Sequence, residues 1–271
     1  VLLNEGSSLT VESGSVFTNS FNMQEGTSVR VTGDITTGAL QVLGNSLTAN
    51  KLIISDAGKA AENTIAGGAN VTLTELSLGK NNALFVGESG DGTPENLGSS
   101  AKVYTGSLKM NATGSSIFVD PNYGTGASLF ATDNIGDNGS TVSGKVGIGS
   151  NSAFGVGFAS MAEFEETLSP YLTNNGGFDG EGAVKNALVL NKPVTIGADQ
   201  GITVDSELKA TDYDTKVSGN ALTLGAGAAL IVTNEALAAD GAVKFANGAG
   251  KVNAAADKSS LVIFAADVTK Q

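Results

Sequence analysis

A short phrase that recurs along the chain constrains its fold more than any other feature of the sequence. Each copy begins with Gly, continues with one or two small polar residues, and ends with two apolar residues that flank a variable one. The first four copies begin at Gly6, Gly26, Gly44 and Gly68, at intervals of 20, 18 and 24 residues. All the copies together occupy residues 6–11, 26–31, 44–49, 68–73, 114–119, 126–131 and 219–224.

This phrase is typical of one coil of a parallel β-helix. Gly supplies a corner where the backbone φ angle turns positive, and the alternation that follows sends Leu and Val inward while Ser and Thr face outward. Stacked coils would align their apolar residues in ladders and share backbone hydrogen bonds. We therefore predict an all-β fold, a parallel β-helix (β-solenoid) with irregular coils of about 20 residues and a short helical interruption. A β-sandwich, which also joins short alternating strands by Gly turns, is the alternative.

The composition agrees with thin, regular layers rather than a bulky globule. Hydrophobic residues make up 41% of the 271 residues, but aromatic residues make up only 6% and Trp is absent. The core must therefore consist of Val, Leu, Ile and Ala, which suit a repetitive layer. Collagen is excluded because 37 Gly residues accompany only 4 Pro residues.

One stretch, residues 159–172, breaks the β pattern and predicts a short helix. Ser160 is placed to cap the first turn, and Glu163 follows three residues later as in a capping box. Pro170 would end the helix. Apolar side chains recur at helical spacing, at Met161, Phe164 and Leu168.

This helix divides the predicted organisation into three parts. A β-solenoid segment spans residues 1–158, a helical and loop interruption spans residues 159–188, and a second β segment that continues the solenoid spans residues 189–271. Within the last part, residues 234–239 are compatible with a helical turn, but the β-rich sequence on either side favours a strand there.

The charge of the chain argues against nucleic acid and membranes as partners. The net charge is −12, and Arg30 is the single arginine among 15 basic residues. Binding to a phosphate backbone requires clustered Lys and Arg, which this sequence lacks. No apolar run approaches the ~20 residues of a membrane-spanning helix, so we expect no membrane-spanning segment.

The residue types also restrict the chemistry. The chain contains no His and no Cys, so Ser-His-Asp and Cys-His catalysis and His- or Cys-ligated zinc or haem sites are excluded. Paired carboxylates could still hydrolyse a glycan, but the lack of Trp and the single arginine give a sugar little to bind. We therefore expect the chain not to be an enzyme. The candidate carboxylates are Glu163, Glu165 and Glu166 in the predicted helix, and Asp212 and Asp214 further along.

Calcium is the one metal for which the sequence offers ligands. Acidic side chains occur in two loops rich in Gly and Asn, and such oxygen ligands suit Ca²⁺. Neither loop has the EF-hand or the Gly-Gly-x-Gly-x-Asp spacing, and solvated turns use the same residue types. The candidate ligands are Glu88, Asp91 and Glu95 in the first loop, and Asp133 and Asp137 in the second.

The recurrent phrases resemble those of a known family. Gly-Ser-Ser-Leu-Thr-Val at 6–11, Gly-Asn-Ala-Leu-Thr-Leu at 219–224 and the Gly-rich stretch 144–154 are similar to the passenger domains of bacterial type V autotransporters and adhesins. That resemblance implies a right-handed parallel β-helix displayed on the outer surface of a bacterium. The family shares a scaffold and not a site, so no functional residue is carried over. The sequence departs from the family plan because it shows no recognisable C-terminal translocator barrel.

These features predict an extracellular, surface-displayed structural or adhesive protein that binds a host-cell or matrix ligand or a glycan. The first alternative is a self-assembling subunit of an extracellular filament or surface layer, joined end to end or laterally. The apolar residues 1–3 and 261–264, near the two ends of the sequence, could then pair between copies by strand addition. The second alternative is a β-helix enzyme that acts on polysaccharides.

Overall fold

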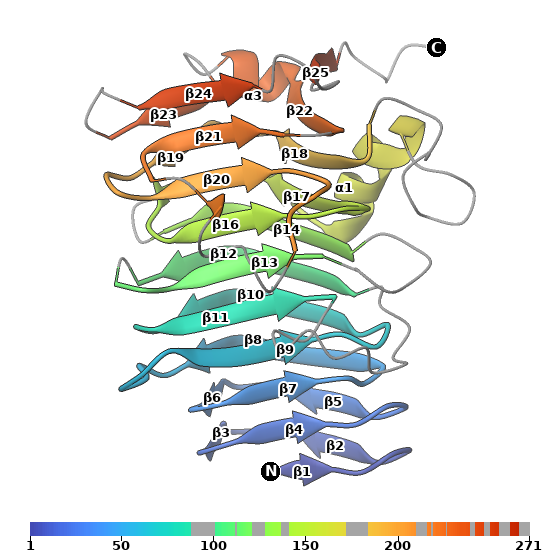
Figure 1. Ribbon diagram of the computed structural model, residues 1–271. Helices are drawn as coiled ribbons and strands as arrows, with labels where there is room; N and C mark the ends of the chain where they lie inside the picture. The colour runs from blue at the N-terminus through green and yellow to red at the C-terminus, as the bar shows by residue number, and fades with distance from the viewer. Residues whose placement is uncertain are drawn as a thin grey trace.

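The strands of this chain stack on one another in a single direction, from the N-terminus to the C-terminus (Figure 1). We refer to each level of the stack as a rung. The structure is a computed structural model that describes residues 1–87, 101–111, 113–120, 128–136, 141–171, 184–209, 216–217, 219–225, 227–238, 242–246, 250–254 and 261–265.

Two long sheets form the sides of the stack. Sheet A consists of β1 (Leu2–Leu3), β4 (Phe21–Met23), β7 (Leu40–Val42), β9 (Ala61–Ile65), β11 (Asn82–Val86), β13 (Ser116–Val119), β16 (Lys145–Ile148), β20 (Gly201–Val204), β21 (Ala221–Leu224) and β24 (Lys251–Ala254), in that spatial order. Sheet B consists of β2 (Ser8–Val11), β5 (Ser28–Val31), β8 (Ser46–Ile54), β10 (Asn70–Leu78), β12 (Lys102–Met110), β14 (Ser128–Ile135), β17 (Ser152–Val156), β18 (Asn186–Leu190), β22 (Ala228–Thr233) and β25 (Leu261–Ala265).

Shorter strands add a third side to parts of the stack. β3 (Val16–Thr18) pairs with β6 (Ile35–Thr37), and β6 pairs with the second half of β8. Sheet C, further along, consists of β15 (Thr141–Val142), β19 (Val194–Ile196) and β23 (Val243–Phe245).

Every strand pair among the described residues is parallel. The prediction of an all-β chain is therefore confirmed, and the β-sandwich alternative is wrong, because the strands of such a sandwich pair antiparallel. Leu2 pairs with Asn22, Ser46 with Asn70, and Asn70 with Lys102. The length of chain between neighbouring rungs thus varies, as the uneven intervals of the Gly phrase predict.

A continuous apolar core fills the space between the sheets. Its buried side chains begin with Phe21 in β4 and continue through Val232 in β22 to Ala236 beyond it. Most are Val, Leu and Ile, as the composition predicts, but Phe130 and Phe154 stack inside the core with ring centroids 4.6 Å apart. Alternate residues of each strand supply this core because side chains of a strand point to opposite faces of its sheet.

The chain alternates between sheets A and B along most of its length, with two departures. β17 and β18 both lie in sheet B, and the helix α1 (Met161–Leu168) with the 3₁₀ turn η1 (Ser169–Tyr171) lies between them. β20 and β21 both lie in sheet A, with residues 205–220 between them. The first departure omits a strand of sheet A and the second omits a strand of sheet B, so the two sheets stay level with each other.

The Gly phrase marks corners, although not always for the reason predicted. Gly6, Gly26 and Gly68 have φ angles of 72°, 69° and 73° before β2, β5 and β10. Gly44, before β8, is needed for space instead, because a Cβ there would collide with Oγ1 of Thr27. The copy that begins at Gly114 leads into sheet A rather than sheet B, so the phrase predicts a strand but not its sheet.

The two expectations about helices have different outcomes. The predicted helix is confirmed as α1, with Ser160 as its N-cap and the Ser160 side chain accepting a hydrogen bond from the Glu163 backbone N–H. The strand favoured for residues 234–239 is wrong, because Asn234–Ala238 forms the helix α3. Asn234 favours a helix start and two alanines follow it, so local propensity prevails over the β-rich surroundings. Across the described residues, neither these helices nor any other is long and apolar enough to cross a membrane.

Candidate functional site

The outer face of sheet B changes chemistry between β12 and β14. Two columns of outward residues, followed from rung to rung through the parallel register, show the change. The first column reads Ser28, Ser46, Asn70, Lys102, Leu129, Ala153, Ala187 and Ala229, and the second reads Arg30, Thr48, Thr72, Tyr104, Ala131, Gly155, Val189 and Ile231. Both columns pass from polar residues to small or apolar ones at the same rung.

The early rungs present polar side chains to solvent. Arg30, Thr48 and Thr72 are exposed. Beside them the Glu75 carboxylate lies 3.4 Å from Nζ of Lys51 and 3.2 Å from Nζ of Lys109. We call this surface the polar face and define it as Thr10, Arg30, Thr48, Lys51, Thr72, Glu75 and Lys109.

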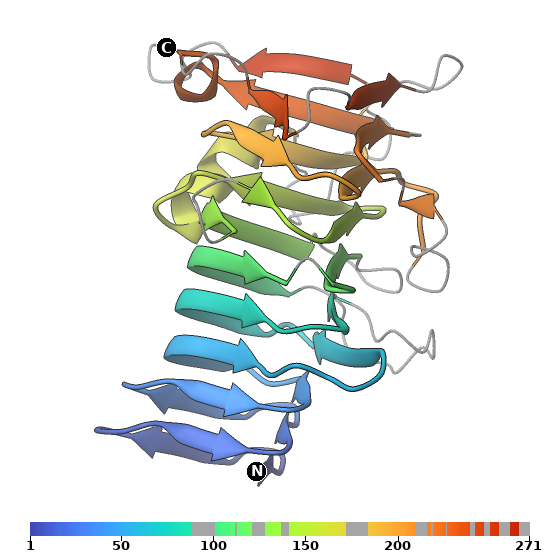
Figure 2. The same cartoon turned by 90° about the vertical axis from the view of Figure 1, so that its left-hand side faces the viewer.

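The later rungs of the same face are covered by α1, which lies outside the stack (Figure 2). Phe164 and Leu168 of the helix are fully buried against the sheet, together with Phe158. Gly155 leaves the space for this packing, because a Cβ at that position would lie 2.5 Å from the Phe164 ring. We call the outward residues that share a buried cluster with these side chains, together with Gly155, the covered face: Leu129, Ala131, Ala153, Gly155, Ala187, Val189, Ala229 and Ile231.

Sheet A is covered on its outer side at a similar level. Phe85 and Phe118 point outward from neighbouring strands and pack edge to face, with ring centroids 6.2 Å apart. Leu208 and Val217, from the segment between β20 and β21, bury them. Each departure from the alternating chain path thus supplies a cover for the sheet that the chain re-enters.

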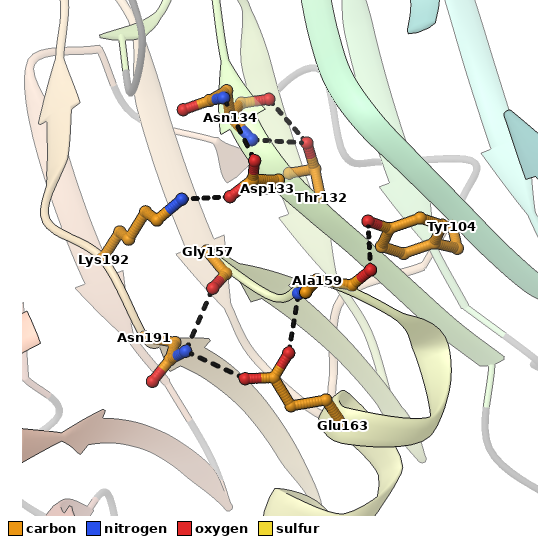
Figure 3. Close-up of polar contacts among 9 residues, drawn as sticks. All are labelled: Tyr104, Thr132, Asp133, Asn134, Gly157, Ala159, Glu163, Asn191 and Lys192. Atoms are coloured by element: carbon orange, nitrogen blue, oxygen red, sulfur yellow. Dashed lines mark hydrogen bonds and ion pairs between the residues drawn. The ribbon is translucent and has the colours of Figure 1, made fainter. Parts of the chain in front are cut away.

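A polar cluster fastens the beginning of α1 to the stack (Figure 3). One carboxylate oxygen of Glu163 accepts a hydrogen bond of 2.7 Å from the Ala159 backbone N–H, one residue before the N-cap, rather than from the Ser160 N–H as in the predicted capping box. The side-chain amide of Asn191 donates to the Gly157 carbonyl at 3.0 Å and to the other Glu163 oxygen at 3.4 Å. The Asn191 carbonyl oxygen in turn accepts a hydrogen bond of 2.6 Å from the Thr233 hydroxyl.

Tyr104, in β12, connects the last polar rung to this cluster through a hydrogen bond. Its hydroxyl donates a hydrogen bond of 2.7 Å to the Ala159 carbonyl. Burial raises the pKa of the Tyr104 phenol above its ordinary value, and the carboxylates of Asp133 and Glu163 raise it further. The Lys192 ammonium forms an ion pair with Asp133 (Figure 3). This arrangement keeps Tyr104 a neutral hydrogen-bond donor.

The described carboxylates proposed for glycan hydrolysis, all in α1, do not form a facing pair. Glu163 caps the helix, Glu165 pairs with Lys102 at 2.5 Å, and Glu166 is exposed to solvent. A glycosidase requires one carboxylic acid and one carboxylate on either side of a glycosidic bond, and these three side chains have separate surroundings. Asp212 and Asp214 lie outside the described residues.

The calcium candidates are mostly beyond what the structure describes. Glu88, Asp91, Glu95 and Asp137 lie outside the described residues. Asp133 belongs to β14 rather than to a loop, and its carboxylate pairs with Lys192. In the part of the chain that the structure describes, no three acidic side chains gather in an arrangement that could hold a metal ion.

The contrast between the polar and covered faces was not predicted from the sequence. The sequence does contain a sign of this contrast. Ala131 and Gly155 occupy the outward column position that Arg30 and Thr72 occupy on earlier rungs. Recognising that these residues share a column requires the register between rungs, and the uneven spacing of the Gly phrase does not give that register.

Comparison with known proteins adds no relative to this picture. No protein family model matches the chain, and no curated protein and no solved structure matches it. The similarity of its phrases to autotransporter passengers therefore stays a prediction, and the functional argument depends on the chain's own residues.

Proposed function

We propose that the chain is a parallel β-helix that acts as a surface-displayed structural or adhesive protein outside the cell. The β-helix is supported by the alternation of strands between sheets A and B, by their parallel register and by the continuous core between them. Such a stack offers long flat faces, which are suited to binding extended ligands.

The observation that carries the adhesive function is the polar face. It remains uncovered over several rungs, while the later rungs of the same sheet are covered by a helix. Its hydroxyl groups both donate and accept hydrogen bonds, and its charged groups occur with both signs. A host-cell or matrix glycan or a hydrophilic protein surface is the partner that fits this chemistry.

An enzyme acting on polysaccharides is the less favoured function. Among the proposed carboxylates that the structure describes, Glu163 and Glu165 already serve α1 as a cap and an ion pair. Catalytic carboxylates face each other across one shared site. The carboxylates of Glu163 and Glu165 instead have different partners, the Ala159 N–H and Lys102.

Binding to arrayed glycans, matrix proteins and cells tests the adhesive function. We expect the 271-residue chain to bind one class of these ligands. Thr72→Lys, in the centre of the polar face, should weaken that binding by about tenfold, because changing a central interface residue commonly costs more than ~1 kcal/mol. Gln24→Lys is the matched control. It adds the same charge at an exposed corner between β4 and β5, outside the polar face.

The result that would contradict the proposal is equally specific. Equal binding by Thr72→Lys and wild type would show that the polar face does not contact the ligand. Release of reducing sugars from any glycan of the array would favour the enzyme instead.

A further inference from the structure

The polar face carries positive charge on a chain that is acidic as a whole. The sequence contains 27 acidic and 15 basic residues. The strands that bear the polar face, β2, β5, β8, β10 and β12, reverse this balance, because Glu75 is their single acidic residue. Their basic residues are Arg30, Lys51, Lys102 and Lys109. Stacking thus gathers on one face cations that are scattered in the sequence.

The basic side chains of the polar face are more accessible than its carboxylate. Glu75 lies between Lys51 and Lys109 and forms an ion pair with each, at 3.4 and 3.2 Å. Its side chain is 14% exposed, whereas the two lysine side chains are 37% and 40% exposed. One carboxylate balances the charge of only one ammonium group. Arg30 is exposed, and no carboxylate among the described residues forms an ion pair with it.

The acidic residues that border these strands lie in turns or already have partners. Asp34 accepts a hydrogen bond of 2.8 Å from the side-chain amide of Asn50. Lys102, beside the helix, pairs with Glu165 of α1 at 2.5 Å. The cations that lack a full partner are therefore Arg30 and the two lysines that share one carboxylate. The acidic residues of the adjoining turns are Glu12, Glu25, Asp34 and Asp56.

The spacing of these cations favours a ligand with separated negative charges. Arg30 lies on β5, Lys51 on β8 and Lys109 on β12, so they extend over three strand intervals, or about 14 Å. Duplex nucleic acid presents one charge about every 1.7 Å, which is much denser. A polysaccharide with one carboxylate on each sugar has wider spacing, and its hydroxyl groups can exchange hydrogen bonds with the exposed Thr48 and Thr72 between the cations.

We infer that the ligand of the polar face is an acidic polysaccharide whose carboxylates pair with Arg30, Lys51 and Lys109. This inference rests on the proposed adhesive function and assigns the ligand class within it. The planar Arg30 guanidinium can hold a carboxylate by two parallel hydrogen bonds, and the lysines add point charges. Binding should weaken as the salt concentration rises, because charges at an exposed surface are screened by salt.

Titration calorimetry of the 271-residue chain with polygalacturonate, and with uncharged dextran as the reference, tests the ligand class. We expect polygalacturonate to bind and dextran not to bind. Arg30→Gln and Lys109→Gln should each weaken binding by about threefold to fivefold, as expected for the loss of an exposed ion pair. Lys59→Gln is the matched control and should bind as the wild type does. It makes the same charge change in an exposed turn between β8 and β9.

Glu75→Gln tests the same charges in the opposite direction. It removes the carboxylate that Lys51 and Lys109 share, so it should tighten polygalacturonate binding by about threefold. Loss of folding cannot produce a tighter complex, so this result would not be confused with damage to the structure. Unchanged or weaker binding by Glu75→Gln, with the fold intact by circular dichroism, would contradict the inference.

Two substitutions at Thr72 separate the ligand class from the adhesive function. Thr72→Lys and Thr72→Glu both place a longer side chain in the centre of the polar face and should weaken binding. The like charge of Thr72→Glu should make its loss of polygalacturonate binding about tenfold larger. A loss no larger than that of Thr72→Lys, or equal binding of dextran, or tighter binding of single-stranded DNA, would overturn the acidic polysaccharide and leave the adhesive function standing. If neither substitution changes the binding of any ligand, the adhesive function of the polar face fails.

Discussion

The early and late rungs of sheet B share one interior and differ in their exteriors. In both regions alternate residues fill the core with side chains such as Val71 and Leu188, which are at most 2% exposed. In the two outward columns the residues are Ser, Thr, Asn, Arg, Lys and Tyr on the early rungs, and Ala, Gly, Leu, Val and Ile on the later ones. The inward pattern therefore builds the stack, and the outward pattern decides whether a rung is left bare or covered.

The comparison also explains why the chain leaves its alternating path where it does. Both departures supply a cover, α1 over sheet B and Leu208 with Val217 over sheet A. Small residues beneath a cover let it approach, as Gly155 does for Phe164 and Gly147 does for Leu208. A covered rung buries both faces of a strand, so it should resist unfolding more than a bare rung does.

The largest expected effect comes from the core of the covered region. Phe130→Ala removes one ring of the stacked Phe130–Phe154 pair and should lower the free energy of unfolding by about 3–5 kcal/mol. Val71→Ala, two rungs earlier in the same inward column, should cost nearer to ~2 kcal/mol, at ~0.8 kcal/mol for each buried methyl group removed. Urea unfolding followed by circular dichroism measures both. A loss for Phe130→Ala no larger than that for Val71→Ala would contradict this ranking.

Gly155→Val tests the covering helix itself. The added side chain cannot coexist with the Phe164 ring in its present position, so α1 should be displaced at a cost of about 1–3 kcal/mol. Thr72→Val is the matched control, in the same outward column on the bare face. It should change stability by less than about 0.5 kcal/mol. Limited proteolysis should cut the Gly155→Val chain within residues 158–171 and spare the control there.

Ser160→Ala sharpens the account of how α1 begins. The Ser160 side chain satisfies the Glu163 backbone N–H at the helix start, and loss of such a cap costs ~1 kcal/mol. Hydrogen exchange should quicken in the first turn of α1 and stay unchanged in β8 and β10. Ser160→Asp, which keeps a capping acceptor, should restore slow exchange. Exchange in Ser160→Ala as slow as in the wild type would show that the cap does not hold the helix.

The smallest effect concerns Tyr104, at the boundary between the two regions. Tyr104→Phe removes the hydrogen bond to the Ala159 carbonyl and should cost about 0.5–1.5 kcal/mol at neutral pH. Because the folded-state pKa of Tyr104 is raised, its stabilisation is full below the unfolded value near pH ~10 and declines as the pH rises through the folded pKa. The stability gap between wild type and Tyr104→Phe should therefore shrink at alkaline pH. A gap that widens there would contradict the direction of the shift.

The sequence predicted the interior of this fold better than its exterior. Alternation after Gly6, Gly26 and Gly68 was enough to identify strands, and Ser160 with Glu163 was enough to identify a helix, because both signals are local. Which sheet a strand joins is a long-range property, so the sequence did not predict that the copy at Gly114 leads into sheet A. The covered face was missed for the same reason. The roles of Ala131 and Gly155 become clear only when the fold places Phe164 against sheet B.

Thiol labelling along the two outward columns of sheet B tests the central claim most directly. The chain has no cysteine, so single substitutions report their own positions without background. Thr48→Cys and Thr72→Cys lie on the polar face, and Ala131→Cys and Ala187→Cys lie on the covered face, where both alanines are 0% exposed. In the native protein the first pair should react with a maleimide reagent about a hundredfold or more faster than the second, and all four should react alike in denaturant. Similar native rates at all four positions would contradict the division of sheet B into bare and covered regions.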